Sequence, residues 1–187
     1  MHFRPCIDIH NGKVKQIVGG SLTDQGNQAK ENFTASENAD YYAKMYQKDG
    51  LIGGHVILLN PVSSEYYRET KAQAILALGA YPKGLQVGGG IHAENAEEFL
   101  EAGASHVIVT SYVFRDGKIN WVNMEKLKHA VGKENVVIDL SCRKKEDGYY
   151  IVTDRWQKFT DVKLTQEVLR EIAGYCDEYL VHGVDVE

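Results

Sequence analysis

Short apolar runs alternate along the chain with stretches in which apolar residues recur at helical spacing. Each run has three to five residues, mostly β-branched or large apolar types. Because the runs are continuous rather than alternating in polarity, they predict strands that are covered on both faces, as in a parallel sheet. The predicted strands cover residues 6–9, 55–59, 85–87, 106–109, 136–140 and 179–181.

Three of the intervening stretches predict helices. Residues 34–37 have the sequence Thr-Ala-Ser-Glu, which resembles a capping box in which a hydroxyl and a carboxylate bind free backbone N–H groups. An apolar stripe follows at 39–46, and Asp49-Gly50 supplies a stop. Two further stripes, at 96–100 and 168–173, end before Gly103 and Gly174. The repeated βα pattern predicts an α/β protein with right-handed crossovers.

Two of the predicted strands share a second pattern, in which an aspartate near the strand's end precedes a basic polar loop and another short strand. Asp8 is followed by Asn11-Gly12-Lys13, where Asn-Gly favours a hairpin turn. Asp139 is followed by the polar stretch 143–148 and the strand-like residues 149–152. The two patterns, about 130 residues apart, are interpreted either as an internal repeat of half the fold or as a chance similarity.

The number of predicted strands separates a barrel from an open sheet. A (β/α)8 barrel needs roughly 250 residues, or about 30 for each βα unit. A chain of 187 residues therefore holds about six units, and its last predicted strand lies almost at its end, where an open sheet would more naturally finish with a covering helix. We predict a single domain over residues 1–187: an α/β chain that forms an incomplete (β/α)8 TIM barrel.

Composition narrows the class of function. A net charge of −5 gives no basic surplus for nucleic acid or an acidic membrane. Three widely spaced cysteines predict neither a disulfide framework nor a zinc cluster, and they favour a reduced, cytoplasmic location. The N-terminal residues lack a signal peptide's apolar stretch, and no apolar run is long enough to cross a membrane. The histidines show no metal-ligand spacing, so we expect no metal cofactor.

Asp8 and Asp139 are the first candidates for chemistry. Each lies near the carboxyl end of an apolar strand, the edge at which catalytic groups gather in α/β barrels. A carboxylate within an apolar strand is unfavourable unless it is solvated or hydrogen-bonded. A pair of carboxylates facing one cavity can divide the roles of acid and base. The alternative interpretation is that each aspartate only caps a turn.

Glycines and hydroxyls follow two other predicted strands. Gly88-Gly89-Gly90 stands between a strand and a helix, where backbone N–H groups and the helix dipole favour a phosphate. The same glycines fit a tight turn that needs positive φ. Thr110 and Ser111 follow the next strand, where they either line the same phosphate site or cap the following helix.

An aromatic ring and an imidazole complete the set of candidates. Trp156 lies in a polar stretch beyond the second predicted hairpin, where it either packs the loop down or stacks on a ligand. His182 ends the last predicted strand. It either faces the functional rim or serves as a hydrogen-bonded wall residue.

The combination of these motifs resembles the phosphoribosylformimino-aminoimidazole carboxamide ribotide isomerases of histidine biosynthesis, in their eukaryotic form. The resemblance covers the whole chain. It is carried by residues 4–9, 11–13, 85–91, 107–111, 137–139 and Trp156, which match in order and spacing. It implies a ribulose-phosphate-binding (β/α)8 barrel that converts an aminoaldose ribotide into an aminoketose without a cofactor.

The resemblance also implies roles for individual residues. Asp8 takes the position of the general base, and Asp139 that of the aspartate near the reacting ribose. Trp156 matches a tryptophan that stacks on the substrate. Glu187 is the best candidate for the acid, with Asp185 next. Parts of the phosphate-binding rim are matched by Gly89, Gly90, Thr110 and Ser111.

The sequence departs from the family pattern at three places. His92 and Asn60 replace an arginine and an aspartate that are frequent in bacterial members. The family holds the second phosphate of its bis-phosphorylated substrate with loops after strands seven and eight, which lie beyond the six predicted units. We therefore expect weak or no turnover from this chain, and pairing of chains through open sheet edges. The alternatives are the sister cyclase of the pathway and a non-catalytic phosphate-binding fragment.

Overall fold

The computed structural model describes residues 2–17, 31–154 and 156–186. The chain forms two compact units, and each has its own arrangement of strands and helices. The first unit contains Met1–Gly90 and Glu97–Val107, and the second contains Ile91–Ala96 and Ile108–Glu187. The organisation of both units as one domain stays a prediction.

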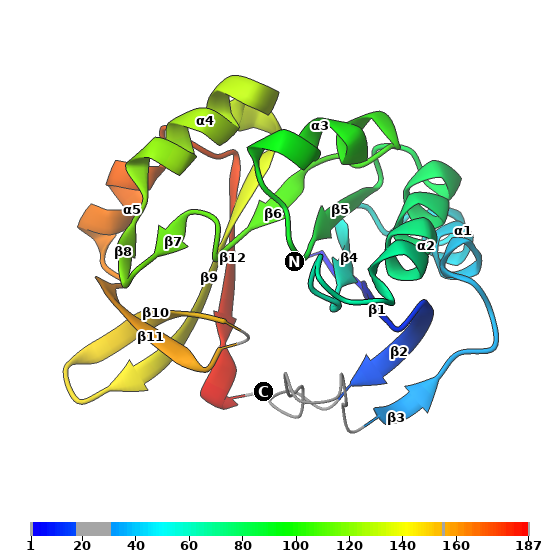
Figure 1. Ribbon diagram of the computed structural model, residues 1–187, viewed down its shortest axis with the longest axis horizontal. Helices are drawn as coiled ribbons and strands as arrows, with labels where there is room; N and C mark the ends of the chain where they lie inside the picture. Colours follow the sequence, from blue (N-terminus) through cyan, green and yellow to red (C-terminus); the bar gives the residue numbers. More distant parts are fainter. Residues whose placement is uncertain (1, 18–30, 155, 187) are drawn as a thin grey trace. The chain divides into compact units, whose positions relative to one another are not determined.

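Parallel strands form the centre of the first unit (Figure 1). Strand β1 (Cys6–His10) pairs in parallel with β4 (Gly54–Leu58), and Asp8 lies opposite Ile57. Strand β4 pairs in parallel with β5 (Leu85–Gly88). Beyond β5, the chain leads through α3 (Ala93–Glu101) into β6 (Val107–Val109), a strand that continues into the second unit. The predicted continuous strands are therefore confirmed here.

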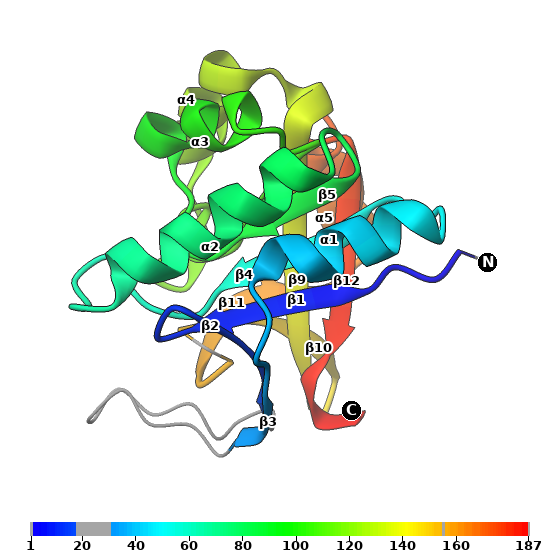
Figure 2. The same ribbon diagram turned by 90° about the vertical axis from the view of Figure 1, so that its right-hand side faces the viewer.

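Helices α1 (Ala39–Lys48) and α2 (Tyr67–Ala80) lie side by side along β1 and β4 (Figure 2). The predicted capping box is wrong, because Thr34 ends strand β3 (Glu31–Thr34) and pairs there with Lys15. Helix α1 begins after Asn38, whose side chain makes no capping bond. Its first N–H group, that of Ala39, instead donates to Gln73 Oε1 of the neighbouring helix α2 at 2.8 Å.

The first predicted hairpin is confirmed. Strand β2 (Lys13–Ile17) runs antiparallel to β1, with His10 opposite Lys13. The turn places Asn11 and Gly12 at φ of 51° and 71°, the left-handed conformation that Asn-Gly turns supply. Strand β3 extends this ribbon beside β2, and it was not expected from the sequence.

The second unit is organised around β9 (Val136–Lys145). This strand pairs in parallel with β12 (Glu178–Gly183), and it lies beside β6. On its carboxyl half it pairs antiparallel with β10 (Gly148–Thr153), which confirms the second predicted hairpin. Strand β10 then pairs with β11 (Lys158–Lys163).

The remaining elements of the second unit are short or lie outside its main sheet. They are the ribbon of β7 (Phe114–Arg115) and β8 (Lys118–Ile119), helices α4 (Trp121–Val131) and α5 (Gln166–Ile172), and the 3-10 turns η1 (Lys133–Asn135) and η2 (Val184–Val186). Helix α5 confirms the predicted stripe at 168–173.

The two units repeat one order of elements. In the first, β1 is followed by β2, β3, α1 and then β4, which returns parallel to β1. In the second, β9 is followed by β10, β11, α5 and then β12, which returns parallel to β9. Asp8 and Asp139 lie on the first strand of each series. The internal repeat is therefore confirmed in its topology.

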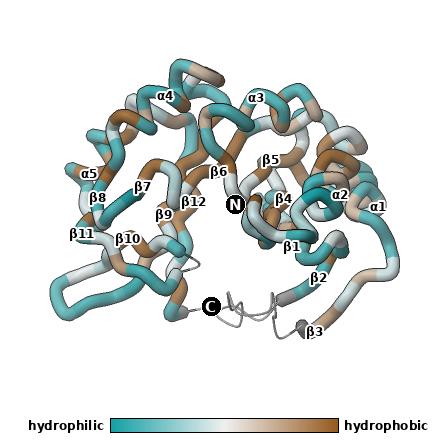
Figure 3. Tube along the Cα trace, in the orientation of Figure 1, coloured by the Kyte–Doolittle hydropathy of each residue, from teal (hydrophilic) through white to brown (hydrophobic). Residues whose placement is uncertain are grey.

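Each unit encloses apolar side chains of its own, which its strands and helices both supply, and the strands include strongly apolar segments of the chain (Figure 3). In the first unit, Ile7, Ile9, Val56, Leu78 and Leu85 are buried. In the second unit, Met124, Ile138, Leu140, Ile151 and Ile172 are buried. Within the described residues, no helix is both long and apolar enough to span a bilayer.

Candidate active site

Asp139 lies on β9 within a set of hydrogen-bond donors. Its Oδ2 accepts from Thr110 Oγ1 at 2.7 Å. Its Oδ1 accepts from the backbone N–H of Ser141 at 2.8 Å and from Ser141 Oγ at 2.7 Å. Burial raises the pKa of the Asp139 carboxyl, and the bonds from Thr110 and Ser141 oppose that rise. The carboxylate is thus held in a fixed orientation in a setting that disfavours its charge.

Ser141 connects this carboxylate to two rings. Its hydroxyl accepts a hydrogen bond from Trp156 Nε1 at 3.2 Å and lies 3.2 Å from His182 Nδ1. The rings of Trp156 and His182 meet edge to face, with centroids 5.1 Å apart. Ser141 itself is 1% exposed. Four side chains from β9, β12 and the loop between β10 and β11 therefore form one hydrogen-bonded cluster.

The loop that carries Trp156 has an unusual backbone. Asp154 and Trp156 adopt φ of 52° and 66°, a region that residues other than glycine rarely occupy. The turn is closed by a bond from the N–H of Gln157 to the carbonyl of Asp154. This conformation directs the indole toward Ser141, so the packing interpretation of Trp156 holds for the chain as described. Its stacking on a ligand stays a prediction.

Asp8 is half-buried on β1, between the buried residues Ile7 and Ile9. The Sγ of Cys6 donates to Asp8 Oδ1 at 3.2 Å. After the neighbouring strand β4, the buried Asn60 holds the β1–β2 turn, because its Oδ1 accepts from the backbone N–H of Asn11 at 2.7 Å. Asn60, which replaces an aspartate that is frequent in bacterial members of the family, therefore stabilises this turn.

The turn after β5 requires glycine because a side chain there would clash with the neighbouring backbone. Gly89 has φ of +100°, and a Cβ atom there would overlap the backbone carbonyl oxygen of Leu58. Gly90 has φ of +70°. The tight-turn interpretation is therefore confirmed, and the phosphate-binding role of both glycines stays a prediction.

The hydroxyls after β6 do not cap a helix, which corrects one interpretation of them. Asn120 caps α4 instead, since its side chain accepts from the N–H of Asn123 at 3.0 Å. Thr110 contacts Asp139, and the exposed Ser111 lines a cavity of about 290 Å³ together with Arg115 and Lys158. Nothing in the sequence pattern indicated this cavity, because its walls come from β7, β10 and β11 as well as the loop after β6.

Of the two candidates for an acid near the chain's end, Glu187 lies outside the described residues. Asp185, on η2, accepts from Arg143 Nε at 2.8 Å and forms an ion pair with it. The sequence did not single out Ser141. Its position two residues after Asp139, where alternate side chains of a strand share a face, is the signal that could have found it.

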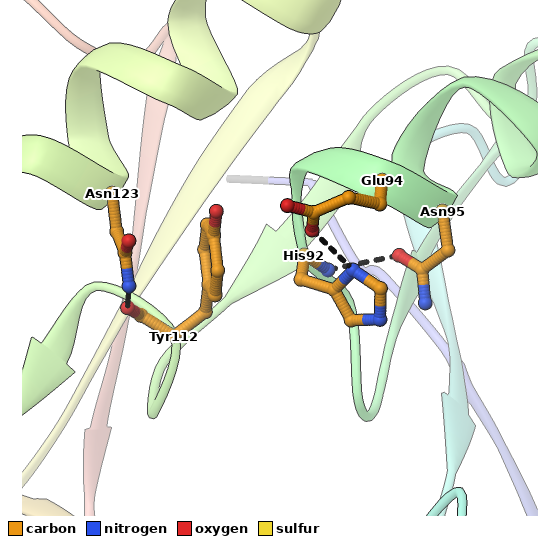
Figure 4. A network of polar contacts seen from close by, with 5 residues as sticks. All are labelled: His92, Glu94, Asn95, Tyr112 and Asn123. Carbon is orange, nitrogen blue, oxygen red and sulfur yellow. Dashed lines mark hydrogen bonds and ion pairs between the residues drawn. The ribbon is translucent and has the colours of Figure 1, made fainter.

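His92 is fixed at the start of α3 (Figure 4). Its Nδ1 lies 2.8 Å from Glu94 Oε2, and its backbone N–H donates to Asn95 Oδ1 at 2.8 Å. The ring lies 6.1 Å from that of Tyr112, whose carbonyl accepts from Asn123 Nδ2. The His92 side chain is therefore held by Glu94, two residues after the glycine turn in the sequence.

These features define an α/β protein whose candidate site is a half-buried carboxylate held by hydroxyl groups. Asp139 lies inside strand β9, which continues to Lys145, and not near the end of a strand as the sequence predicted. Among the residues that the structure covers, no group of three or more His, Cys, Asp or Glu side chains is placed to hold a metal ion.

The chain belongs to the histidine biosynthesis protein family, whose pattern matches residues 3–187. This is a TIM-barrel family, so the predicted fold class is confirmed together with the βα order of both units.

Similar proteins with assigned names are isomerases. The chain is 54% identical to a chloroplastic phosphoribosyl-imidazole-4-carboxamide isomerase of Medicago truncatula, over all of this chain and 60% of the relative. It is 44% identical to the isomerases of the same name from Yarrowia lipolytica and Saccharomyces cerevisiae, over 99% of this chain and 69% of each relative. The chain therefore spans about three fifths of the plant protein's length.

Proposed function

We propose that the protein acts in the isomerase step of histidine biosynthesis, in which an aminoaldose ribotide rearranges to an aminoketose. The observation that carries the proposal is the Asp139 carboxylate, held by Thr110 and Ser141 in the part of β9 that pairs in parallel with β12. The relatives that match at 44–54% identity are named as isomerases, which supports the proposal independently.

The rearrangement moves protons and loses no atoms. An acid protonates the ring oxygen, the ring opens, and a cationic imine remains at the first carbon. A base then removes the proton from the second carbon and leaves an enaminol. The enaminol becomes the ketone when the first carbon gains a proton and the hydroxyl on the second carbon loses one, so that no net proton is gained or lost. We assign the base to Asp8 and the acid to Glu187, and we place Asp139 beside the reacting ribose.

The ligand is a small bis-phosphorylated ribotide. We propose that Gly89 and Gly90 supply backbone N–H groups to one phosphate, with hydroxyl groups from Thr110 and Ser111. Trp156 stacks on the substrate in this proposal. The φ of 66° at Trp156 supports a functional role for this loop, because strained backbone conformations cluster at functional sites.

The experiment is a turnover assay of the purified protein with the aminoaldose ribotide. Asp8→Asn and Asp139→Asn each remove a carboxylate while they preserve shape, and we expect turnover to fall by at least about 100-fold for each. Asp147→Asn is the matched control, because Asp147 is exposed and, among the described residues, accepts hydrogen bonds from Tyr150 and Lys163 of its own ribbon. If Asp8→Asn and Asp139→Asn both keep the turnover of the parent protein, the proposal is wrong.

The same assay separates the alternatives. Ammonia-dependent cyclisation without isomerisation would favour the sister cyclase. Binding of the ribotide that neither variant changes would favour a non-catalytic phosphate-binding protein. A cytoplasmic location and the pairing of chains through sheet edges stay predictions, and the Medicago relative is named as chloroplastic.

A further inference from the structure

The hydroxyl of Ser141 has more neighbours than it has hydrogens. Its oxygen lies 2.7 Å from Asp139 Oδ1, 3.2 Å from Trp156 Nε1 and 3.2 Å from His182 Nδ1. A serine hydroxyl offers one hydrogen and two lone pairs. The indole N–H can only donate, so Trp156 occupies one lone pair in every state of the cluster.

One hydrogen and one lone pair then remain to be divided between Asp139 and His182. When Asp139 is a carboxylate, it needs the hydrogen, and the imidazole must donate from Nδ1. When the imidazole instead accepts at Nδ1, the hydrogen turns toward it, and the carboxyl must itself carry a proton to donate to the serine oxygen. The two side chains therefore adopt complementary states.

We propose that Ser141, His182 and Trp156 are positioning residues that hold Asp139 in its ionised form, and that the Nδ1–H of His182 fixes the direction of the Ser141 hydroxyl. The catalytic consequence of this positioning rests on the proposed isomerase function. A carboxylate held in this way stabilises the cationic imine formed on ring opening, while the proton for the ring oxygen comes from another group.

Burial disfavours the charge of Asp139, and the donors of the cluster oppose that effect. Asp139 also accepts from Thr110 and from the backbone N–H of Ser141, so three donors converge on it. The charge of His182 acts on Asp139 in the same direction as those bonds. The other titratable groups nearby are the Cys142 thiol, whose pKa is raised by burial and then by Asp139, and Asp185, which is paired with Arg143.

The test follows the Asp139 carboxyl by carbon NMR in the protein without substrate, across a pH titration. His182→Phe keeps a ring and removes the donor. We expect the apparent pKa of Asp139 to rise by about 0.5 to 1 pH units, because the Ser141 hydroxyl is free to turn away. His182→Asn restores an N–H donor without the charge, and we expect it to recover at least half of that change.

A double variant isolates the path through the hydroxyl. With Ser141→Ala already present, we expect His182→Phe to change the titration of Asp139 by less than about 0.2 pH units, since the link is absent. Trp156→Phe keeps an aromatic ring at this position and removes the indole N–H that donates to Ser141. We expect it to raise the pKa of Asp139, as His182→Phe does. This variant also serves if His182→Phe does not fold.

Two results overturn the proposal. One is an Asp139 titration that is identical in the parent, His182→Phe and Trp156→Phe. The other is His182→Asn behaving like His182→Phe, because the effect is then one of charge and not of the hydrogen bond. In the turnover assay of His182→Phe, the acid limb of kcat shifts with the NMR titration while KM changes less than about twofold. Because the NMR measurement needs no substrate, failure of the isomerase proposal leaves it intact.

Discussion

At the scale of single residues, function and stability conflict at Asp139. Burial opposes its charge, and hydrogen bonds from the hydroxyl groups of Thr110 and Ser141 hold it in place. A group whose pKa is raised on folding destabilises the folded state at pH values above that pKa, because ionisation is easier in the unfolded chain. The protein is therefore less stable at neutral pH than a neutral side chain at this position would make it.

Asp139→Asn should raise the free energy of unfolding by about 0.5 to 2 kcal/mol at pH 8. An amide oxygen can still accept from Ser141, and no charge is buried. The gain should begin near pH 4, where aspartate ionises in the unfolded chain, and level off above the folded-state pKa. Denaturant unfolding between pH 4 and pH 8 measures it, and a loss of stability at pH 8 would contradict the argument.

Asp147→Asn provides a control of opposite sign. Its bonds from Lys163 and Tyr150 hold the pKa of Asp147 below its usual value. The stability that Asp147 contributes is present above the unfolded-state pKa and is lost as pH falls. We expect this variant to be slightly less stable than the parent at pH 8 and equal to it below about pH 3.

The sequence was informative about the site where one residue type was improbable in its context. An aspartate in an apolar strand and a tryptophan in a polar loop both stood out, and Asp139 and Trp156 do belong to one cluster. Ser141 did not stand out, because serine is ordinary in a strand that passes into a polar loop. Its importance comes from a bond to His182, 41 residues away, which no local pattern contains.

At the scale of elements, the turn between β1 and β2 depends on side chains from elsewhere in the first unit. Asn60 Oδ1 accepts from the Asn11 N–H and from Thr70 Oγ1, each at 2.7 Å. Thr70 Oγ1 in turn accepts from the Gly12 N–H at 3.0 Å. Both Asn60 and Thr70 are buried, so water does not readily replace either one.

Asn60→Ala should destabilise the chain by about 2 kcal/mol, because it leaves the Asn11 N–H without its acceptor. Thr70→Val should have an effect of similar size. The double variant should lose less than the sum, with a coupling of at least about 0.5 kcal/mol, since both residues act in one network. Chemical denaturation measures all three, and Ser63→Ala, at an exposed site, should remain within about 0.5 kcal/mol. Strict additivity would argue against the network.

The turn after β5 gives a second prediction at this scale. Gly89→Ala should lower the free energy of unfolding by at least about 2 kcal/mol, because its Cβ meets the Leu58 carbonyl and its φ is unfavourable for alanine. Gly174→Ala should change it by less than about 0.5 kcal/mol, since a Cβ there meets nothing within 4 Å. Thermal unfolding in phosphate-free buffer separates this effect from ligand binding.

Strands and hairpins were easier to predict than helices in this chain. The continuous apolar runs and the Asn-Gly turn are local signals, and each was confirmed. Helix α2 was missed because the residues on its buried side, Thr70, Ala74 and Ala77 among them, are small or polar and form no apolar stripe. The supposed capping box failed because Thr34 was already engaged in strand pairing.

At the scale of the whole molecule, each unit has a central parallel strand with partners on both sides and a ribbon whose last strand has a partner on one side only in the described part of the chain. Strand β4 lies between β1 and β5, and β9 pairs with both β10 and β12. Strands β3 and β11 end the two ribbons in the described part of the chain. Protection from solvent should follow this order.

Hydrogen exchange should therefore be slowest in β4 and β9. We expect their amides to exchange at least about 100-fold more slowly than those of β3 and β11, in both units alike. Mass spectrometry of peptides from each strand provides the measurement. Equal protection in β9 and β11 would show that the ribbon is as stable as the strand on which it rests.

The backbone at Trp156 has a consequence for how substitutions there are ranked. Most proteins tolerate alanine better than glycine, because glycine gains more freedom on unfolding. At φ of 66° that order reverses, since only glycine relaxes the local twist of the chain. We therefore expect Trp156→Gly to unfold at a higher temperature than Trp156→Ala, although both variants lose the indole. The difference between their melting temperatures would measure the backbone strain that the native protein tolerates at this position.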